Sequence, residues 1–189
     1  RDLLDLVGPG LDDLVPWRVE RGLSPRPAIA TVSRKLSFSV PDGLGEQGRE
    51  LLVLVPEEAP VRRERELTVQ GADVVRLGPG PMIPGGAVVE ALVERGKPLI
   101  CSVAGPQMFH SLAAAGRLDR LYLTMAQVLL GGTDFDTLLQ GQRLDPPIGM
   151  SLASLYFDAA ATESSGQLIQ VLETGPDGPE RPSNQRESQ

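Results

Sequence analysis

Three short stretches of this 189-residue sequence combine residue types that can hold an anionic ligand. The first is residues 31–35 (TVSRK), in which a hydroxyl and two cations follow directly on a β-branched run. Ser33 offers one hydrogen-bond donor and Arg34 offers a forked set, the donor geometry that suits a phosphate group. The competing interpretation is a solvated basic turn.

The second stretch is residues 103–108 (VAGPQM), where a strand pattern gives way to a helical one. Ala104 and Gly105 are small enough to let a ligand approach the backbone. Pro106 suits the first position of a helix, where no amide hydrogen is needed. The unpaired amides of the first turn, including that of Gln107, and the helix dipole favour an anion there. A tight strand-to-helix turn without a ligand explains the same residues.

The third stretch is residues 129–133 (LLGGT). Its paired glycines, Gly131 and Gly132, permit a positive φ or a close approach of the backbone to another group. A plain turn accounts for them equally well.

None of the remaining polar residues forms a catalytic constellation. The single histidine, His110, follows Phe109 on a predicted helix and is interpreted as solvated or locally bonded. The single cysteine, Cys101, is interpreted as a buried strand residue, and Asp134 and Asp136 as solvent-facing carboxylates. The sequence has no phosphate-binding P-loop, no Ser-His-Asp pattern and no cluster with metal-ligand spacing, so no metal is expected.

Alternating strand and helix patterns must position these stretches. Strands are predicted at residues 28–33, 51–55, 72–77, 99–103 and 121–125, and helices within 57–70, around 88–93 and at 106–115. Two further strands, 152–158 and 168–173, have no helix between them and therefore pair antiparallel. The pattern predicts an α/β fold with three layers, a mainly parallel sheet and antiparallel C-terminal strands. Such sheets bind ligands beyond the carboxyl ends of their strands.

Composition excludes several classes of protein. The net charge of −7 argues against nucleic acid and anionic membranes as partners. One cysteine fits a reducing, cytoplasmic setting and rules out an internal disulfide framework. No apolar run approaches the roughly 18 residues that span a membrane, and no signal peptide is apparent. We expect a lead-in at residues 1–27, a nucleotide-binding domain at 28–174 and a disordered tail at 175–189.

Taken together, these segments resemble the reductase domain of the riboflavin-biosynthesis deaminase/reductase. Residues 26–34 (RPAIATVSR) are similar to the family's "RPxxAVVSR" strand, and residues 104–109 (AGPQMF) to its "GGPxL" turn. Residues 112–124 (LAAAGRLDRLYLT) are similar to "LLxAGLVDELxLT", and residues 128–132 (VLLGG) to "PxLLGG". The resemblance covers about residues 22–173 and is strongest over 99–139.

The resemblance implies a dihydrofolate-reductase-like fold and NADPH as the cofactor. It implies that Ser33 and Arg34 hold the 2′-phosphate. It also implies that the pyrophosphate lies against four consecutive residues, Ala104, Gly105, Pro106 and Gln107. Gly131 and Gly132 would lie near the cofactor or the edge of the sheet. It further implies a homodimer, with the antiparallel C-terminal strands as its expected contact.

Two departures from the family pattern leave two functions open. The family's turn usually reads "EGGP", whereas this chain has Val103 at the acidic position. The family's opening "SLDGKIA" strand and "GxxTxR" turn are not found before Arg26, so either the chain is a fragment or its substrate half is degenerate. One hypothesis is an NADPH-dependent reductase acting on a heterocyclic or ribosylamino-pyrimidine-like small molecule. The other is a non-catalytic NADPH-binding or regulatory protein on the same fold.

Overall fold

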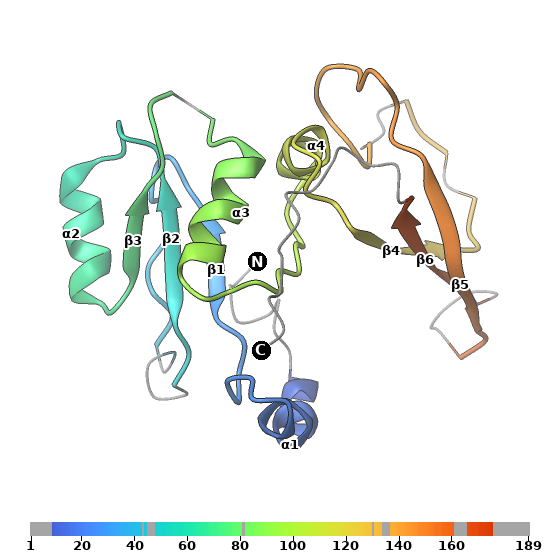
Figure 1. Cartoon of the computed structure of the whole chain (residues 1–189), viewed down its shortest axis with the longest axis horizontal. Helices are drawn as coiled ribbons and strands as arrows, with labels where there is room; N and C mark the ends of the chain where they lie inside the picture. The colour runs from blue at the N-terminus through green and yellow to red at the C-terminus, as the bar shows by residue number, and fades with distance from the viewer. Residues whose placement is uncertain are drawn as a thin grey trace, which may run out of the picture. The chain divides into compact units, whose positions relative to one another are not determined.

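The computed structural model describes residues 9–42, 44, 48–80, 82–129, 131–133, 137–160 and 166–175. These residues form two compact units, Arg1–Ile83 and Pro84–Gln189, and each unit is described by itself. The order of helices and strands along the chain can be followed by colour and label in Figure 1.

The first unit is built around a parallel sheet of three strands. A 3-10 helix, η2 (Pro9–Leu14), and a short helix, α1 (Val15–Glu20), precede it. The strands are β1 (Ile29–Val32), β2 (Leu51–Val55) and β3 (Asp73–Arg76), in the spatial order β1-β2-β3. Helix α2 (Val61–Val69) connects β2 to β3 and lies within the predicted range of 57–70, with Pro60 at its N-cap.

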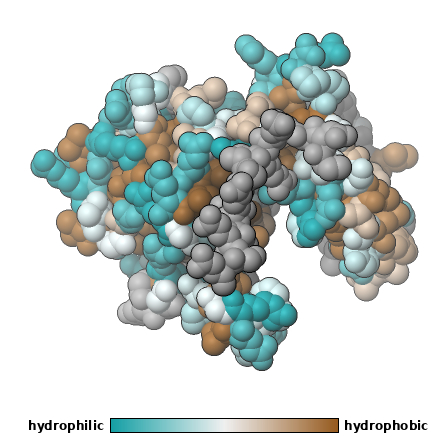
Figure 2. Space-filling view, viewed as in Figure 1, coloured by the Kyte–Doolittle hydropathy of each residue, from teal (hydrophilic) through white to brown (hydrophobic). Residues whose placement is uncertain are grey.

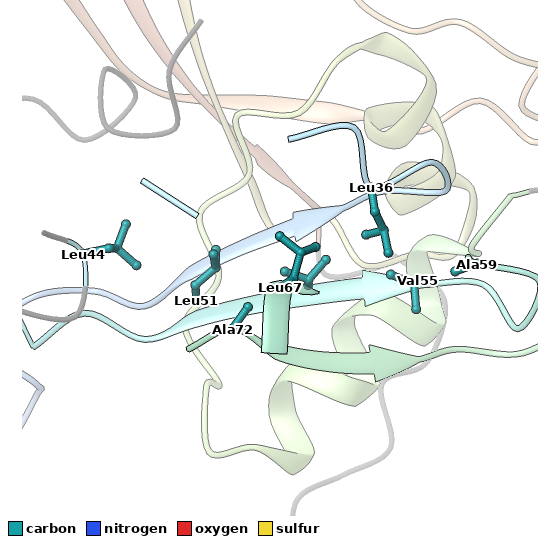
Figure 3. Close-up of a cluster of buried hydrophobic side chains, with 8 residues drawn as sticks. Leu36, Leu44, Leu51, Val55, Ala59, Leu67 and Ala72 are labelled. Carbon is teal, nitrogen blue, oxygen red and sulfur yellow. The ribbon is translucent and has the colours of Figure 1, made fainter. Parts of the chain in front are cut away.

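The central strand β2 is buried along its whole length, and none of its five residues is more than 1% exposed. Leu67 of α2 packs toward β2 and is itself fully buried. The buried cluster around them is shown in Figure 3 and consists of Leu36, Leu44, Leu51, Val53, Val55, Ala59, Leu67 and Ala72. This burial on both faces is what the unbroken apolar run of residues 51–55 predicted.

The second unit contains two helices and an antiparallel sheet. Helices α3 (Gly85–Glu94) and α4 (Pro106–Ala114) pack against each other, and each is followed by a glycine with positive φ, Gly96 at 71° and Gly116 at 64°. Strands β4 (Arg120–Ala126), β5 (Met150–Asp158) and β6 (Gln167–Thr174) form a sheet in the order β4-β6-β5. The predicted antiparallel pairing of the last two strands is confirmed.

The α/β fold class is confirmed, and two details of the predicted sheet are corrected. The predicted strand at residues 99–103 does not form, because no strand in the described part of the chain pairs with it. Cys101 within it is exposed rather than buried. The strand predicted at 121–125 exists as β4, but it runs antiparallel to β6, so the described strands are three parallel and three antiparallel. An apolar run indicates that a segment can be buried. Whether the segment forms a strand depends on a neighbouring strand that pairs with its backbone.

The close packing of α3 on α4 makes Gly85 the most constrained glycine at this contact. Its N–H donates to the Ser111 hydroxyl at 2.7 Å, and a Cβ built on it would lie 2.5 Å from the Leu112 backbone nitrogen. We predict that Gly85→Ala lowers the free energy of unfolding by about 1–3 kcal/mol, the usual result of overpacking.

The matched control for this prediction is the next residue, Gly86, whose Cβ would meet only the Ala115 Cβ at 3.6 Å. Gly86→Ala should leave stability unchanged or raise it by up to about 1 kcal/mol, since alanine is the better helix former. Urea unfolding measures both variants. Equal effects of the two substitutions would show that α3 and α4 do not approach this closely.

Candidate functional site

The basic stretch predicted to hold a phosphate lies in the turn that follows β1. The Ser33 N–H extends the ladder by donating to the Leu54 carbonyl at 3.0 Å, and the Ser33 Oγ accepts a hydrogen bond from the Leu36 N–H at 3.1 Å. Arg34 and Lys35 are exposed, and neither forms an ion pair with any residue that the structure describes. The turn therefore presents two uncompensated cations at the carboxyl end of a parallel strand.

The loops after β2 and β3 reach the same edge of the sheet, and a carboxylate ties them together. Glu58 accepts hydrogen bonds from the Gly80 N–H at 3.0 and 3.3 Å, and the Glu57 N–H donates to the Gly78 carbonyl at 3.0 Å. The hydrogen bond from Gly80 is the main cause that lowers the pKa of Glu58. This amide is therefore already satisfied by a carboxylate, whereas Arg34 and Lys35 of the β1 turn have no ion-pair partner among the described residues.

In the second unit, an open hollow of about 260 Å³ lies at the start of α4. Gly105 is the N-cap, with φ −68° and ψ 172°, and no side chain caps the helix. Pro106 follows, and the N–H groups of Gln107 and Met108 in the first turn have no carbonyl partner within the helix. A Cβ built on Gly105 would meet no atom within 4 Å, so the fold itself does not require glycine at this position.

The opposite wall of the hollow is Gln140, which sequence reasoning missed. Its N–H donates to the Pro106 carbonyl at 3.1 Å. His110 on α4 holds the same loop, because its Nε2 lies 2.6 Å from the Gln142 carbonyl oxygen and its ring lies against Gly141. His110 was predicted to be solvated or locally bonded, whereas its partner lies 32 residues along the chain, in the loop that contributes Gln140 to the hollow. Gln140 carries no motif, and its role follows only from these long-range contacts.

The structure brings together three of the predicted site residues in this unit: Gly105, Pro106 and Gln107. Ala104 is exposed directly before the hollow without lining it, and its N–H lies 3.4 Å from the Ser102 hydroxyl. Gly131 and Gly132 are exposed and do not line the hollow.

The other residues singled out in the sequence do not contribute to either feature as far as the structure describes them. A Cβ on Gly131 would meet open space, and its φ lies outside the left-handed region. Asp134, Asp136 and the predicted tail from residue 176 onward lie outside the described residues. Among the residues that are described, no group of three His, Cys, Asp or Glu could hold a metal ion, and no helix is long and apolar enough to cross a membrane.

Comparison with known proteins identifies the fold. No family model matches the sequence, and a search of curated proteins finds no match. Among solved structures, the chain is similar to a pyrimidine reductase-like protein from Corynebacterium diphtheriae, with a TM-score of 0.67 and 20% sequence identity. The alignment covers 87% of this chain and 68% of that chain. The chain has a pyrimidine reductase-like fold.

This pyrimidine reductase-like fold confirms the resemblance found in the sequence at the level of architecture. Fold and chemistry remain separate questions, because one fold hosts many functions. Two features of this chain offer unpaired donors, the turn after β1 and the hollow at the start of α4.

The contact between Gly141 and His110 predicts how substitutions in this loop affect the stability of the protein. A Cβ on Gly141 would lie 2.4 Å from the His110 Nδ1, so Gly141→Ala should lower the free energy of unfolding by about 1–3 kcal/mol. In the same loop, Gly149 has open space around its Cβ, and Gly149→Ala should be close to neutral. Adding His110→Ala removes the clashing ring, so the double variant should cost less than the sum of the two single changes. Thermal or urea unfolding gives all four values, and strict additivity would contradict this packing.

Proposed function

We propose that this protein is an NADPH-dependent reductase of the pyrimidine reductase type. Its substrate would be a small heterocyclic or ribosylamino-pyrimidine-like molecule. The observation that carries the proposal is the hollow at the start of α4, which is lined by Gly105 and by Gln107 and Met108, two first-turn residues whose N–H groups have no helical partners. The similar protein from Corynebacterium diphtheriae, described as pyrimidine reductase-like, supports the class of reaction.

The residues of the hollow fit a pyrophosphate. The donors are the N–H groups of Gln107 and Met108, and the dipole of the nine-residue helix α4 adds a favourable field for an anion. None of the described lining residues is acidic, so no carboxylate among them opposes a phosphate there. Gln140 adds a side-chain amide to the lining, and an amide can donate to a phosphate oxygen.

The β1 turn fits the 2′-phosphate that distinguishes NADPH from NADH. Arg34 is exposed and unpaired among the described residues, and its planar guanidinium can donate two parallel hydrogen bonds to a phosphate. The hydroxyl of Ser33 accepts from Leu36, which leaves its own hydrogen to donate.

In the proposed reaction, the protein orients the reactants and does not supply a strong acid or base. NADPH, when bound, supplies a hydride. The amides of α4 would hold the pyrophosphate, and holding a reactant in place lowers the entropic part of the barrier. Neither feature contains a histidine, cysteine or carboxylate that could serve as a strong acid or base.

A second candidate function, NADPH binding without catalysis, is favoured by Val103. This residue occupies the position where the resembling family has a glutamate, and its side chain is 70% exposed. A valine cannot supply the hydrogen bonds by which a carboxylate would order a polar substrate. Loss of NADPH absorbance on addition of candidate pyrimidine substrates separates the two functions, since a binding protein would hold NADPH without consuming it.

We also propose that the protein acts as a homodimer. The antiparallel sheet of the second unit carries a group of exposed apolar side chains, and hydrophobic surface is visible over it in Figure 2. The exposed apolar residues on β4 and β5 are Tyr122, Met125, Leu152, Leu155, Tyr156 and Phe157. By the strand register, Met125, Leu152, Leu155 and Phe157 share one face of the sheet, and Tyr122 and Tyr156 lie on the other. Exposed apolar surface of this kind commonly marks an interface.

Removing the guanidinium of the β1 turn tests the choice of cofactor. We predict that Arg34→Ala weakens NADPH binding by about 1.5–3 kcal/mol, the typical contribution of a charge-assisted hydrogen bond. NADH lacks the 2′-phosphate and serves as the internal control, so its affinity should barely change. Fluorescence titration with both dinucleotides gives the two numbers. An equal loss for NADPH and NADH would show that Arg34 does not contact the 2′-phosphate.

A charge placed at Gly105 tests the site of the pyrophosphate. With φ at −68°, position 105 accepts any L-residue, and aspartate is a favoured N-cap, so Gly105→Asp should fold at least as well as the parent. Repulsion between its carboxylate and a phosphate about 4 Å away is of order 4 kcal/mol in a partly screened site, roughly a thousandfold in affinity.

Gly105→Ser is the matched control, because serine also caps a helix but carries no charge. Its NADPH affinity should stay much closer to that of the parent. Circular dichroism verifies that both variants are folded before titration. Parent-like affinity in folded Gly105→Asp would place the pyrophosphate elsewhere.

A further inference from the structure

The turn that carries Arg34 and Lys35 continues into a backbone conformation that is unusual for its residue. Leu36 has a φ of +53°, in the left-handed region that a leucine rarely adopts. Its side chain is fully buried, and it belongs to the core cluster around β2. A turn that ends in such a residue keeps its shape only where its surroundings hold it there.

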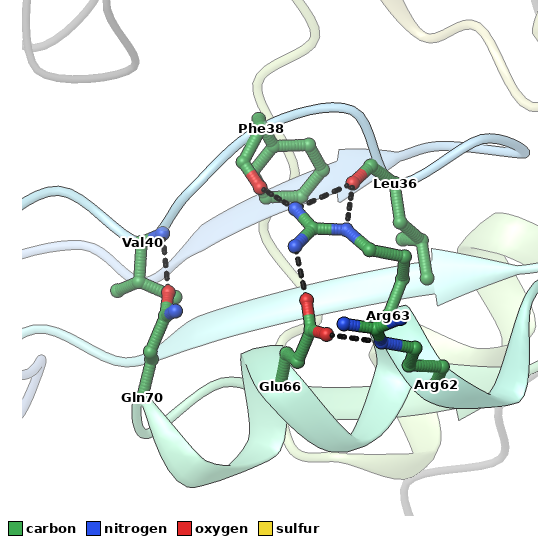
Figure 4. A network of polar contacts seen from close by, with 7 residues as sticks. All are labelled: Leu36, Phe38, Val40, Arg62, Arg63, Glu66 and Gln70. Carbon is green, nitrogen blue, oxygen red and sulfur yellow. Dashed lines mark hydrogen bonds and ion pairs between the residues drawn. The ribbon is translucent and has the colours of Figure 1, made fainter.

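Arg63 on α2 stabilises this turn by hydrogen bonds to its backbone carbonyls. Its Nε donates to the Leu36 carbonyl at 3.1 Å, and its Nη2 donates to the carbonyls of Leu36 at 3.0 Å and Phe38 at 2.7 Å (Figure 4). Its Nη1 pairs with the Glu66 carboxylate. A planar guanidinium can bond two carbonyls of one loop at the same time, which a single ammonium group cannot do with the same geometry.

Two neighbours complete this arrangement. The hydrogen bond from Arg63 is the main cause that lowers the pKa of Glu66, so this carboxylate stays ionised and keeps the guanidinium oriented. Further along the loop, the Val40 N–H donates to the Gln70 side-chain oxygen at 3.0 Å (Figure 4). The loop from Leu36 to Val40 is thus held along α2 by polar side chains.

Arg63 spends most of its donors within the protein. Four of the five N–H groups of its guanidinium bond Leu36, Phe38 and Glu66. Arg34, two residues before Leu36, is exposed and has no partner among the described residues. Arg63 therefore stabilises the turn, whereas Arg34 presents its charge to solvent.

We propose that Arg63 is a positioning residue that affects the choice between NADPH and NADH. This inference rests on the proposed NADPH-binding function. By bonding the carbonyls of Leu36 and Phe38 it holds the Ser33–Leu36 turn in one conformation. Arg34 then meets the 2′-phosphate without first having to order its own backbone, and preorganisation of this kind increases affinity. Arg63 contacts no ligand, so its effect falls on the discrimination between NADPH and NADH.

The experiment compares Arg63→Met with Arg62→Met. Arg62 is the adjacent residue on α2, and its side chain is 91% exposed. Among the described residues it forms a 3.0 Å ion pair with Glu66 and does not bond the loop. Each full-length variant is titrated with NADPH and with NADH by fluorescence. We expect Arg63→Met to lower the ratio of NADPH to NADH affinity by about tenfold, equivalent to the loss of one charge-assisted hydrogen bond. Arg62→Met should keep the ratio of the parent.

Arg63→Lys is a second, more conservative variant that keeps the test valid if Arg63→Met does not fold. It keeps the charge beside Glu66 and the aliphatic stem but cannot reproduce the fork, so its selectivity should fall between those of the parent and Arg63→Met. Parent-like selectivity in a folded Arg63 variant, or an equal loss for both dinucleotides, would overturn the positioning role while leaving NADPH binding in place. A parent that does not prefer NADPH would overturn the proposed function and this inference with it.

Discussion

The complete burial of β2 is the constraint on which the first unit depends. A strand without access to water must pair its backbone groups within the protein, because an unpaired buried amide or carbonyl is costly. β2 meets this requirement by pairing with β1 on one side and β3 on the other, both parallel. Parallel neighbours end at the same edge of the sheet. The turn that carries Ser33 and Arg34 therefore emerges beside the loops that follow β2 and β3.

Polar side chains hold the loops at both candidate binding features, and at the loop after β1 they act together with apolar packing. Arg63 bonds the carbonyls of the loop after β1, whose Leu36 is buried in the core, and His110 bonds the loop that contributes Gln140 to the hollow. Hydrogen bonds to the backbone of a loop satisfy its polar groups and restrict its conformation. Such bonds also leave neighbouring donors free for a ligand, as at Arg34 and at the first turn of α4.

The sequence predicted the local elements well where the physical cause is local. Pro60 and Pro106 mark the starts of α2 and α4, and glycines with positive φ follow α3 and α4, because these residues restrict or permit backbone conformations by themselves. The strand predicted at residues 99–103 failed for a nonlocal reason. Its apolar composition suits a buried strand, but a strand also needs a neighbouring edge, and no described strand pairs with it.

The sequence by itself determined the α/β class, the residues of the basic turn and the helix start with Gly105 as its cap, because residue type and short-range spacing define these features. Only the tertiary structure decided which distant residues support them. Gln140 lies far along the chain from α4 and reaches it through a loop that His110 holds. Arg63 lies 27 residues from Leu36 and reaches its carbonyl because α2 packs beside the loop. Each of these contacts joins residues that are far apart in the sequence, so no short-range pattern in a single sequence predicts them.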